Sequence, residues 1–263
     1  MAKLGIFDSG VGGLTVQKAV LERLPAVETI YLGDTARVPY GTKSPEVVTQ
    51  YSIRNGRFLV ARGIDLLVVA CNTASAVALP ALHAQLEVPV LGVVEPGARA
   101  ASSASRTGRI GVIGTPSTVA SGAYQRAIRA LVPDAQVTAR ACPLFVPLAE
   151  EGWTDPEDEV VRAVARRYLA PLLEARVDTV VLGCTHYPLL KAAIARELAG
   201  VTLVDSADAV AGEVRVRLGE RATGRSAAPT PHHFFVTDTP DRFLAVAERF
   251  LGRAIASAEQ VDI

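Results

Sequence analysis

The sequence has few cysteines, no excess of charge and no long apolar run, and each absence excludes a class of protein. Three cysteines among 263 residues are too few and too odd in number for a disulfide framework, so a reducing compartment is expected. Lys and Arg (27) balance Asp and Glu (27), which gives no electrostatic reason to expect a nucleic acid or an anionic membrane as a partner. No apolar run approaches the roughly 20 residues that span a bilayer. Residues 1–10 lack the apolar core and cleavage site of a signal peptide, so we expect a globular protein of the cytoplasm.

Short β-branched runs alternate with longer stretches of helical periodicity. Several runs are almost continuously apolar, which is typical of parallel strands covered on both faces. The expected strands are residues 3–7, 29–32, 66–70, 90–94, 109–113, 136–139, 179–182 and 202–204. The expected helices are residues 14–23, 45–61, 74–86, 117–131, 157–175 and 189–198. Pro45 and Pro156 are expected in first helical turns, behind the caps Ser44 and Asp155. This alternation predicts parallel α/β layers.

The same landmarks occur twice in the same order, which indicates a duplication. KLGIFDSG, with Gly5, matches RIGVIGTP, with Gly111, at an offset of 111 − 5 = 106 residues. RGIDLLVVAC, ending at Cys71, matches ARVDTVVLGC, ending at Cys184, at an offset of 184 − 71 = 113 residues. The alternative is that all parallel α/β sequences look alike at this level, but the matched cysteines disfavour it. We predict two similar parallel-sheet α/β domains related by pseudo-twofold symmetry, with the active site in the cleft between them.

The predicted domain limits follow from where the repeat stops. Residues 95–108, rich in small residues and glycine, are expected to form the crossover between the copies. Beyond residue 206 we expect a helix, a polar loop, a strand and a last helix, at residues 207–218, 221–231, 234–237 and 240–251. This tail is too small for a core of its own and should pack on the first copy. The first domain would then comprise residues 1–95 and 207–263, and the second residues 96–206.

Cys71 and Cys184 occupy equivalent positions, each at the end of an apolar strand before an expected helix start. Unpaired main-chain N–H groups and the helix dipole favour a thiolate at such a position. Two thiols that face each other across an approximate twofold axis are suited to remove a proton from one face of a carbon and deliver one to the other. The alternative is that both are buried as small hydrophobes, which is common for cysteine and which we expect for Cys142. The matched positions favour the catalytic interpretation.

Three ionisable side chains are candidates to adjust the protonation of these thiols. Asp8 ends the first strand, His186 follows Cys184 by two residues, and Glu150 lies in an expected loop after the second copy's VPL. A neighbouring Asp or His can prepare a thiol to act as acid or as base. The alternatives are that Asp8 caps a turn, that His186 caps a helix, and that Glu150 is a solvated loop residue.

Small polar residues near the carboxyl ends of the expected strands are the binding candidates, because parallel sheets bind ligands there. Hydroxyls, amides and helix-start N–H groups can hold the carboxylates of a small dianionic ligand without arginine. The candidates are Ser9, Tyr40, Gly41, Asn72, Thr73, Thr115, Thr118 and Thr185. The glycines of residues 10–13 lack the dinucleotide-binding spacing, and no P-loop motif occurs. The remaining histidines show no ligand spacing with the cysteines, so no metal is expected.

The motifs FDSGVGGLTV, VPYG, ACNTASA, GTPSTVASGAY, CPLFVPLAEEG and LGCTHYPLL together resemble those of the glutamate racemases. These are cofactor-independent amino-acid racemases that supply D-glutamate for bacterial peptidoglycan. The match runs in order from residue 5 to about residue 206, roughly three-quarters of the chain, and the two cysteine motifs are its most specific part. The tail is not diagnostic.

The resemblance implies a role for each candidate. Cys71 and Cys184 would be the two proton donors and acceptors, with Cys184 acting on L-glutamate and Cys71 on D-glutamate. Asp8 would assist the first thiol, and His186 and Glu150 the second. The implied substrate contacts are Asp8–Ser9, Tyr40–Gly41, Asn72–Thr73 and Thr185–His186. No cofactor is expected, because no lysine lies at a cysteine strand end to hold pyridoxal phosphate.

Two other functions stay open on the sequence alone. A related enzyme would racemise aspartate or a hydantoin, or would decarboxylate its substrate with one such cysteine. A non-catalytic duplicated module would bind a small anion between its lobes and would need neither thiol. The sequence favours an enzyme with glutamate as its small-molecule substrate. It leaves the oligomeric state open, a homodimer included.

Overall fold

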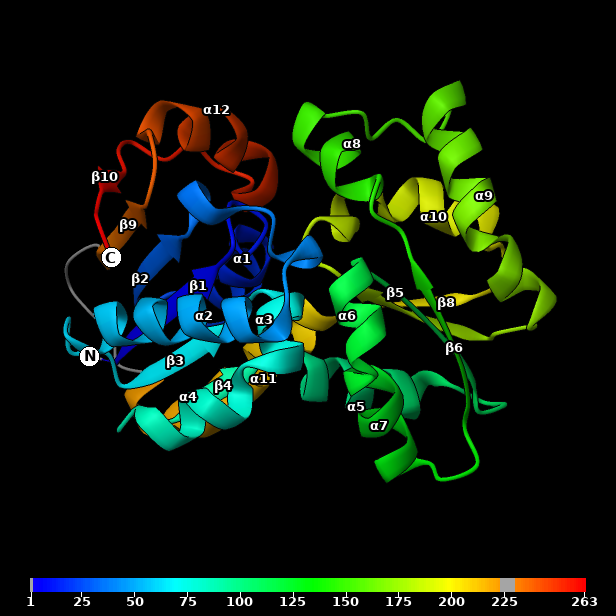
Figure 1. The fold of residues 1–263 in the computed structure, drawn as a ribbon, viewed down its shortest axis with the longest axis horizontal. Coiled ribbons are helices and arrows are strands. Elements are labelled where there is room, and N and C mark those ends of the chain that lie inside the picture. Colours follow the sequence, from blue (N-terminus) through cyan, green and yellow to red (C-terminus); the bar gives the residue numbers. More distant parts are fainter. Residues whose placement is uncertain (1, 223–229) are drawn as a thin grey trace.

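The computed structural model describes residues 2–222 and 230–263, which form two parallel sheets with helices on both faces (Figure 1). The first sheet has the strand order β10-β9-β2-β1-β3-β4, and the second has the order β6-β5-β7-β8. Every neighbouring pair is parallel. The order β2-β1-β3-β4 of the first sheet is repeated by β6-β5-β7-β8 of the second, as a duplication requires. The prediction of two similar parallel-sheet α/β domains is confirmed.

The strands lie within a few residues of their expected positions. They are β1 (Lys3–Asp8), β2 (Glu28–Gly33), β3 (Leu66–Val69), β4 (Val90–Gly92), β5 (Arg109–Gly114), β6 (Gln136–Ala141), β7 (Thr179–Gly183), β8 (Thr202–Asp205), β9 (His232–Val236) and β10 (Glu259–Gln260). The short β10 was not predicted, because a two-residue strand leaves no periodic pattern.

The helices carry most of the chain between these strands. They are α1 (Leu14–Arg23), α2 (Pro45–Val60), α3 (Asn72–Val77), α4 (Leu79–Gln85), α5 (Val94–Ala104), α6 (Pro116–Ser121), α7 (Ala123–Leu131), α8 (Phe145–Glu151), α9 (Glu159–Glu174), α10 (Lys191–Glu197), α11 (Ser206–Leu218) and α12 (Pro240–Leu251). Short 3-10 turns are η1 (Thr35–Arg37), η2 (Tyr40–Thr42), η3 (Tyr187–Leu190) and η4 (Gly219–Ala222).

Several helix predictions need correction. The expected helices 74–86 and 117–131 are each two helices, α3 with α4 and α6 with α7. The expected crossover 95–108 is mostly the helix α5, because its alanines favour a helix and pack in the core of the second half. Ser44 caps α2 as expected, accepting from the Val47 N–H at 3.4 Å. The cap at the start of α9 is Asp158 rather than Asp155, so Pro156 lies before the helix. The expected loop 221–231 lies largely outside the described residues.

Apolar residues of the central strands point alternately to the two faces of each sheet. Ile6 of β1 packs in a cluster with α1, α11 and α12, whereas Phe7 packs with α2 on the other face. In the second sheet, Leu182 of β7 packs with α9 and Val181 with α5 and α7. Both faces of each sheet are therefore covered, which is why the strands read as nearly continuous apolar runs.

The tail after the repeat packs on the first sheet, as predicted. β9 pairs with β2, and β10 pairs with β9. α11 lies against α1 and α5, and α12 lies against α1. The chain thus passes between the halves near α5 and α11 (Figure 1). We keep residues 1–95 with 207–263, and residues 96–206, as the proposed limits of the two domains.

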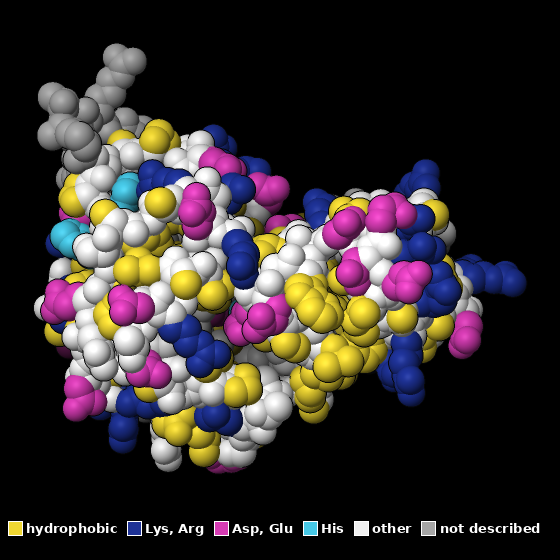
Figure 2. Space-filling model, turned by 90° about the horizontal axis from the view of Figure 1, so that it is seen from above, with side chains coloured by type: hydrophobic (Ala, Val, Ile, Leu, Met, Phe, Trp, Pro, Cys, Tyr) yellow, Lys and Arg dark blue, Asp and Glu magenta, His cyan; other side chains and the backbone are white. Residues whose placement is uncertain are grey.

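The surface seen from above, over α8 and α12, shows a larger and a smaller lobe side by side and in contact (Figure 2). Charged side chains of both signs are scattered over it, and hydrophobic ones gather on the right-hand lobe (Figure 2). Exposed large hydrophobic residues of the second half are Leu131, Leu144, Trp153, Val160 and Leu173. None of the helices in the described ranges is long and apolar enough to cross a membrane.

Asp65 and Asp178 hold equivalent positions just before β3 and β7. Asp65 accepts a hydrogen bond from the Lys3 N–H at 2.8 Å. Asp178 accepts from the N–H and the hydroxyl of Thr107 at 2.7 and 2.8 Å and from the hydroxyl of Ser105 at 2.7 Å. Although partial burial opposes it, these hydrogen bonds hold the pKa of Asp178 well below its usual value. Each carboxylate fastens the start of one half's first strand to its central strand.

Asp178→Asn is expected to lower the free energy of unfolding by about 1–2 kcal/mol at neutral pH, since it weakens several charge-assisted hydrogen bonds at a partly exposed site. A carboxylate with a lowered native pKa stabilises the fold above its unfolded pKa of about 4, and this contribution is lost as the pH falls further. Urea denaturation from pH 7 to pH 3 should show the variant and the wild type converging at the acid end. An equal difference at every pH would contradict this account, and Glu174→Gln, at an exposed residue of α9, is the control.

Candidate active site

A cavity of about 170 Å³ lies between the two halves, at the carboxyl ends of their strands. Its volume is below the roughly 300–1,000 Å³ of pockets for drug-sized ligands, so it suits a small metabolite. Most of the predicted site residues line it: Ser9, Tyr40, Gly41, Cys71, Asn72, Thr73, Thr115, Cys184, Thr185 and His186. Asp8, Glu150 and Thr118 do not line it but contact residues that do or lie next to them.

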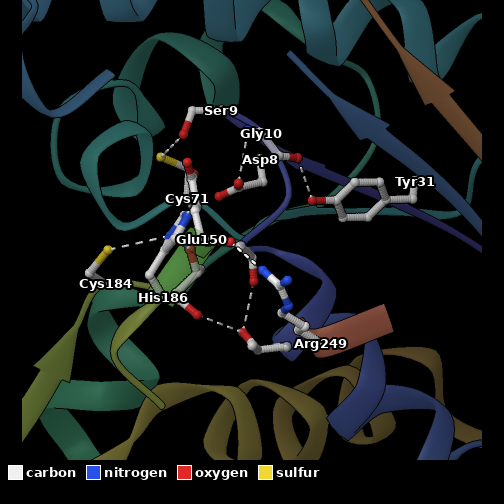
Figure 3. A network of polar contacts seen from close by, with 12 residues as sticks. Asp8, Ser9, Gly10, Tyr31, Cys71, Glu150, Cys184, His186 and Arg249 are labelled. Carbon is white, nitrogen blue, oxygen red and sulfur yellow. Dashed lines mark hydrogen bonds and ion pairs between the residues drawn. The ribbon is translucent and has the colours of Figure 1, made fainter. Parts of the chain in front are cut away.

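Cys71 and Cys184 line this one cavity from different halves. Cys71 follows β3 and lies at the N-cap of α3, and its Sγ donates to Ser9 Oγ at 3.7 Å. Cys184 follows β7 directly, and its Sγ lies 3.9 Å from His186 Nδ1. The expected helix start after Cys184 is only the 3-10 turn η3, three residues on. Figure 3 shows each sulfur with its polar neighbour, Ser9 for Cys71 and His186 for Cys184.

The protonation of Cys71 differs from the expectation of a helix-start thiolate. Burial and the neighbouring Asp8 raise the pKa of the Cys71 thiol to about 12. The hydrogen bonds of the sulfur with the Ala74 N–H at the start of α3 and with the Ser9 hydroxyl lower it by less. Because only 5% of Cys71 is exposed, desolvation outweighs the dipole of a six-residue helix. Cys71 is therefore a protonated thiol at neutral pH.

His186 and Glu150 form an ion pair beside Cys184. His186 Nε2 lies 2.9 Å from Glu150 Oε1, and the imidazole is buried. Burial alone would lower the pKa of His186, but hydrogen bonds to Cys184 and Glu150 and the nearby negative charges raise it to about 10. The hydrogen bond from His186 also lowers the pKa of Glu150. Glu150 lies on α8 rather than in the expected loop, and His186 makes no helix-capping bond, so its capping alternative is wrong.

Asp8 is a buried carboxyl next to the cavity. Its Oδ2 accepts from the Gly10 N–H at 2.9 Å, so it does cap the turn that follows β1. Its Oδ1 is buried without a hydrogen-bond partner. Burial raises the pKa of Asp8, against the opposing charge of His186. A carboxyl that can hold a proton near Cys71 is suited to exchange protons with that thiol.

Two sets of polar groups reach the cavity from both halves. Asn72 Oδ1 accepts from the Tyr124 hydroxyl at 2.7 Å, which leaves its buried Nδ2 without a partner. The hydroxyls of Thr73, Thr115 and Thr118 form a triangle with edges of 2.9, 3.0 and 3.3 Å. Thr118 does not line the cavity, so it supports the other two hydroxyls. The Asn72 amide nitrogen is thus free to donate to a carboxylate.

The hydroxyl of Tyr40 is not available to a ligand, although Tyr40 lines the cavity. It donates to Asp34 and accepts from Asn55 Nδ2 at 3.1 Å. Burial and the charge of Asp34 raise the pKa of Tyr40 far above its usual value. Tyr40 therefore contributes its ring and backbone, and not the hydroxyl donor that the sequence suggested.

The apolar wall of the cavity was missed by reasoning from the sequence. It consists of Val38, Pro39, Pro116, Pro143, Val146 and Pro147. These residues lie inside the quoted motifs VPYG, GTPST and CPLFVPL, but side chains without polar atoms gave no reason to single them out. Their effect is to exclude water, which strengthens every electrostatic interaction inside the cavity. Cys142 is fully buried outside the cavity, as predicted.

The two halves approach each other closely at Gly12. A Cβ there would lie 2.2 Å from Thr185 Oγ1 and 2.5 Å from His186 Nδ1. Next to it, Thr15 Oγ1 donates to the Thr185 main-chain oxygen at 3.2 Å. A glycine is needed because any side chain would displace the groups beside Cys184. Within the described residues, no cluster of three or more His, Cys, Asp or Glu side chains could hold a metal ion.

Comparison with known proteins decides the family. The Asp/Glu/Hydantoin racemase family model matches residues 14–214. The chain belongs to the Asp/Glu/Hydantoin racemase family. It is 56% identical over 262 residues to the glutamate racemase of Geobacter metallireducens, covering 99% of this chain and 96% of that protein. The resemblance seen in the motifs is confirmed.

Solved structures of this family share the fold over the whole chain. The crystal structure of a glutamate racemase from Bacillus anthracis has a TM-score of 0.92 and 40% identity, covering 100% of this chain and 98% of that one. A glutamate racemase from Francisella tularensis, in complex with D-glutamate, has a TM-score of 0.92 and 34% identity, covering 99% and 97%. The tail that was not diagnostic in the sequence is thus shared with these relatives.

Glu150→Gln is expected to lower the pKa of His186, because it replaces the negative partner with a neutral amide. The native pKa of about 10 exceeds the unfolded value of about 6.5. The ion pair therefore stabilises the fold fully below about pH 6.5, and this is lost as the pH rises through the native pKa. NMR titration of the His186 ring, one of four histidines, measures the change. Glu151→Gln, at the exposed neighbour, is the control, and an unchanged His186 titration in Glu150→Gln would contradict the assignment.

Proposed function

We propose that this protein is a glutamate racemase that interconverts L- and D-glutamate without a cofactor, by proton transfer between the α-carbon and two cysteines. One observation carries the proposal: thiols from equivalent positions of two similar halves line a single small cavity. A racemase has to remove a proton from one face of a carbon and supply one to the other. A duplicated fold presents one thiol to each face.

The two halves give the thiols different ionisable neighbours. Cys71 carries its proton at neutral pH and is ready to act as an acid. Cys184 lies beside the His186–Glu150 pair, whose protonated imidazole can donate a hydrogen bond or a proton to the sulfur. In the direction from L- to D-glutamate, Cys184 removes the α-proton and Cys71 supplies one from the opposite face. Asp8 then restores the proton on Cys71, and Cys184 releases its proton to water, because His186 is already protonated at neutral pH.

The carbanion-like transition state has to be stabilised by the cavity itself. The free Asn72 amide and the hydroxyls of Thr73, Thr115 and Thr185 are available to the carboxylates of glutamate. Donors fixed in advance in a cavity that excludes water stabilise developing charge more than the same groups in water. The retained ammonium of the substrate, next to the α-carbon, adds to this effect.

The proposal extends to the cellular role that the resemblance implies. We infer that the enzyme acts in the cytoplasm of a bacterium and supplies D-glutamate for peptidoglycan synthesis. A homodimer is compatible with this role. The family name also covers aspartate and hydantoin racemases, but the close relatives are named glutamate racemase. Parallel assays with L-aspartate and L-glutamate separate these substrates, and we expect activity on glutamate.

Cys71→Ala and Cys184→Ala should each reduce racemisation by about 10²–10⁴-fold, since each removes one acid–base group. Glutamate should still bind, because its carboxylate donors remain. The change in circular dichroism of a glutamate solution measures racemisation, and calorimetry measures binding. Cys142→Ala is the matched control: this buried cysteine lies in the same half as Cys184 but outside the cavity, and its variant should remain active. Full turnover by either Cys71→Ala or Cys184→Ala would overturn the proposal.

Deuterium incorporation distinguishes two bases from one. In deuterated water, the product enantiomer should carry deuterium at Cα while recovered substrate at early times carries little. This follows because the group that takes the substrate's proton is not the group that supplies the product's. Mass spectrometry after chromatographic separation of the enantiomers measures both labels. Equal early labelling of substrate and product would indicate a single shared base.

A further inference from the structure

A buried carboxylate that the proposed mechanism does not use lies behind the cavity wall. Asp34, at the end of β2, is fully buried. It accepts hydrogen bonds from the Tyr40 hydroxyl, from Thr237 Oγ1 at 2.9 Å and from Arg37 Nη1 at 3.1 Å. A buried carboxylate is tolerated only where such donors surround it. Of these three donors, Tyr40 also lines the cavity, so Asp34 connects directly to its wall.

The other donors to Asp34 tie it to the tail of the chain. Thr237 follows β9, and its Oγ1 also accepts from the Ala36 N–H at 2.9 Å. Arg37 donates to the main-chain oxygen of Ile263 and lies over the ring of Tyr51, 5.0 Å from its centroid. Thr237 and Ile263 both lie beyond residue 214, where the match to the family model ends. The tail thus completes the surroundings of Asp34 although none of the tail lines the cavity.

The segment that Asp34 holds is where the first half meets the second beside the cavity. Tyr40 and Gly41 begin η2, and a Cβ on Gly41 would lie 2.7 Å from Thr115 Cβ. The ring of Tyr40 packs at 5.8 Å from that of Tyr51 on α2. The Tyr40 hydroxyl both donates to Asp34 and accepts from Asn55, which fixes the position of its ring. The backbone of Gly41, the next residue, is positioned with it.

We propose that Asp34 is a positioning residue for substrate binding, which acts through Tyr40 and depends on Thr237 and Ile263 from the tail. This inference rests on the proposed racemase function. Asp34 holds a wall of the cavity and not a thiol, so its loss should weaken substrate binding more than the proton transfers. A change of that kind raises KM and leaves kcat nearly unchanged.

A double-mutant cycle between Asp34 and Tyr40 tests the proposal. Asp34→Asn removes the charge and one of the two acceptor oxygens, so the amide cannot accept from Tyr40, Thr237 and Arg37 at the same time. We expect KM for glutamate to rise by about tenfold with kcat within about threefold. If Asp34 acts through Tyr40, the same substitution in the Tyr40→Phe background should raise KM several-fold less. Thr237→Val, which removes one donor to Asp34, should raise KM by a smaller factor.

Asp65→Asn is the matched control, since Asp65 is also a hydrogen-bonded carboxylate but lies at the amino end of β3. It should lower the melting temperature without changing KM. An unchanged KM in Asp34→Asn, or the same increase in both Tyr40 backgrounds, would overturn the proposal. If Asp34→Asn does not fold, the cycle with Thr237→Val decides in the same way. Failure of the proposed function would appear instead as an inactive wild type.

Discussion

The burial of two thiols where the sheets meet is the constraint on which the rest of this molecule depends. Parallel strands end at one edge, and two copies of the sheet bring these edges together. Desolvation there raises the pKa of Cys71, so this thiol keeps its proton. The apolar wall of valines and prolines maintains that desolvation. The fold therefore sets the chemistry of the site through solvent exclusion as much as through the residues it places there.

The two thiols are equivalent in topology but not in electrostatics. Cys71 has a buried carboxyl, Asp8, as its ionisable neighbour, whereas Cys184 has a cationic imidazole paired with Glu150. The duplication supplied two sulfur positions, and later differences between the copies supplied different proton carriers. A racemase has to work in both directions, so in the proposed mechanism each thiol has to serve as acid and as base. The different ionisable neighbours of the two thiols, Asp8 for Cys71 and His186 for Cys184, allow both roles at a single pH.

Much of the fold could be predicted because its causes are local. Apolar runs such as the one before Cys184 indicate buried strands. The matched segments that end at Cys71 and Cys184 predicted two similar sheets. Helix interruptions were missed because they depend on single residues within periodic segments. The cap of α9 was misplaced by three residues, since Asp155 and Asp158 both suit the position.

The sequence predicted which residues lie at the site better than it predicted their protonation and hydrogen bonds. Motif positions placed most candidates at the cavity, but the hydroxyl of Tyr40 is occupied by Asp34, which lies outside every quoted motif. The protonation of Cys71 could not be predicted, because burial is a property of the assembled halves and cannot be read from a strand end. The prolines of the cavity wall were not predicted for a related reason. They act by excluding water, which depends on the assembled cavity and leaves no motif of polar residues in the sequence.

The shared construction of the cavity has a consequence for how the enzyme keeps its protons. Its walls come from both halves, so any parting of the halves wets Cys71 and removes the desolvation that holds its proton in place. The thiol would then exchange its proton with bulk water between one turnover and the next. In the proposed mechanism, the contact between the halves therefore keeps the transferred proton from exchanging with water.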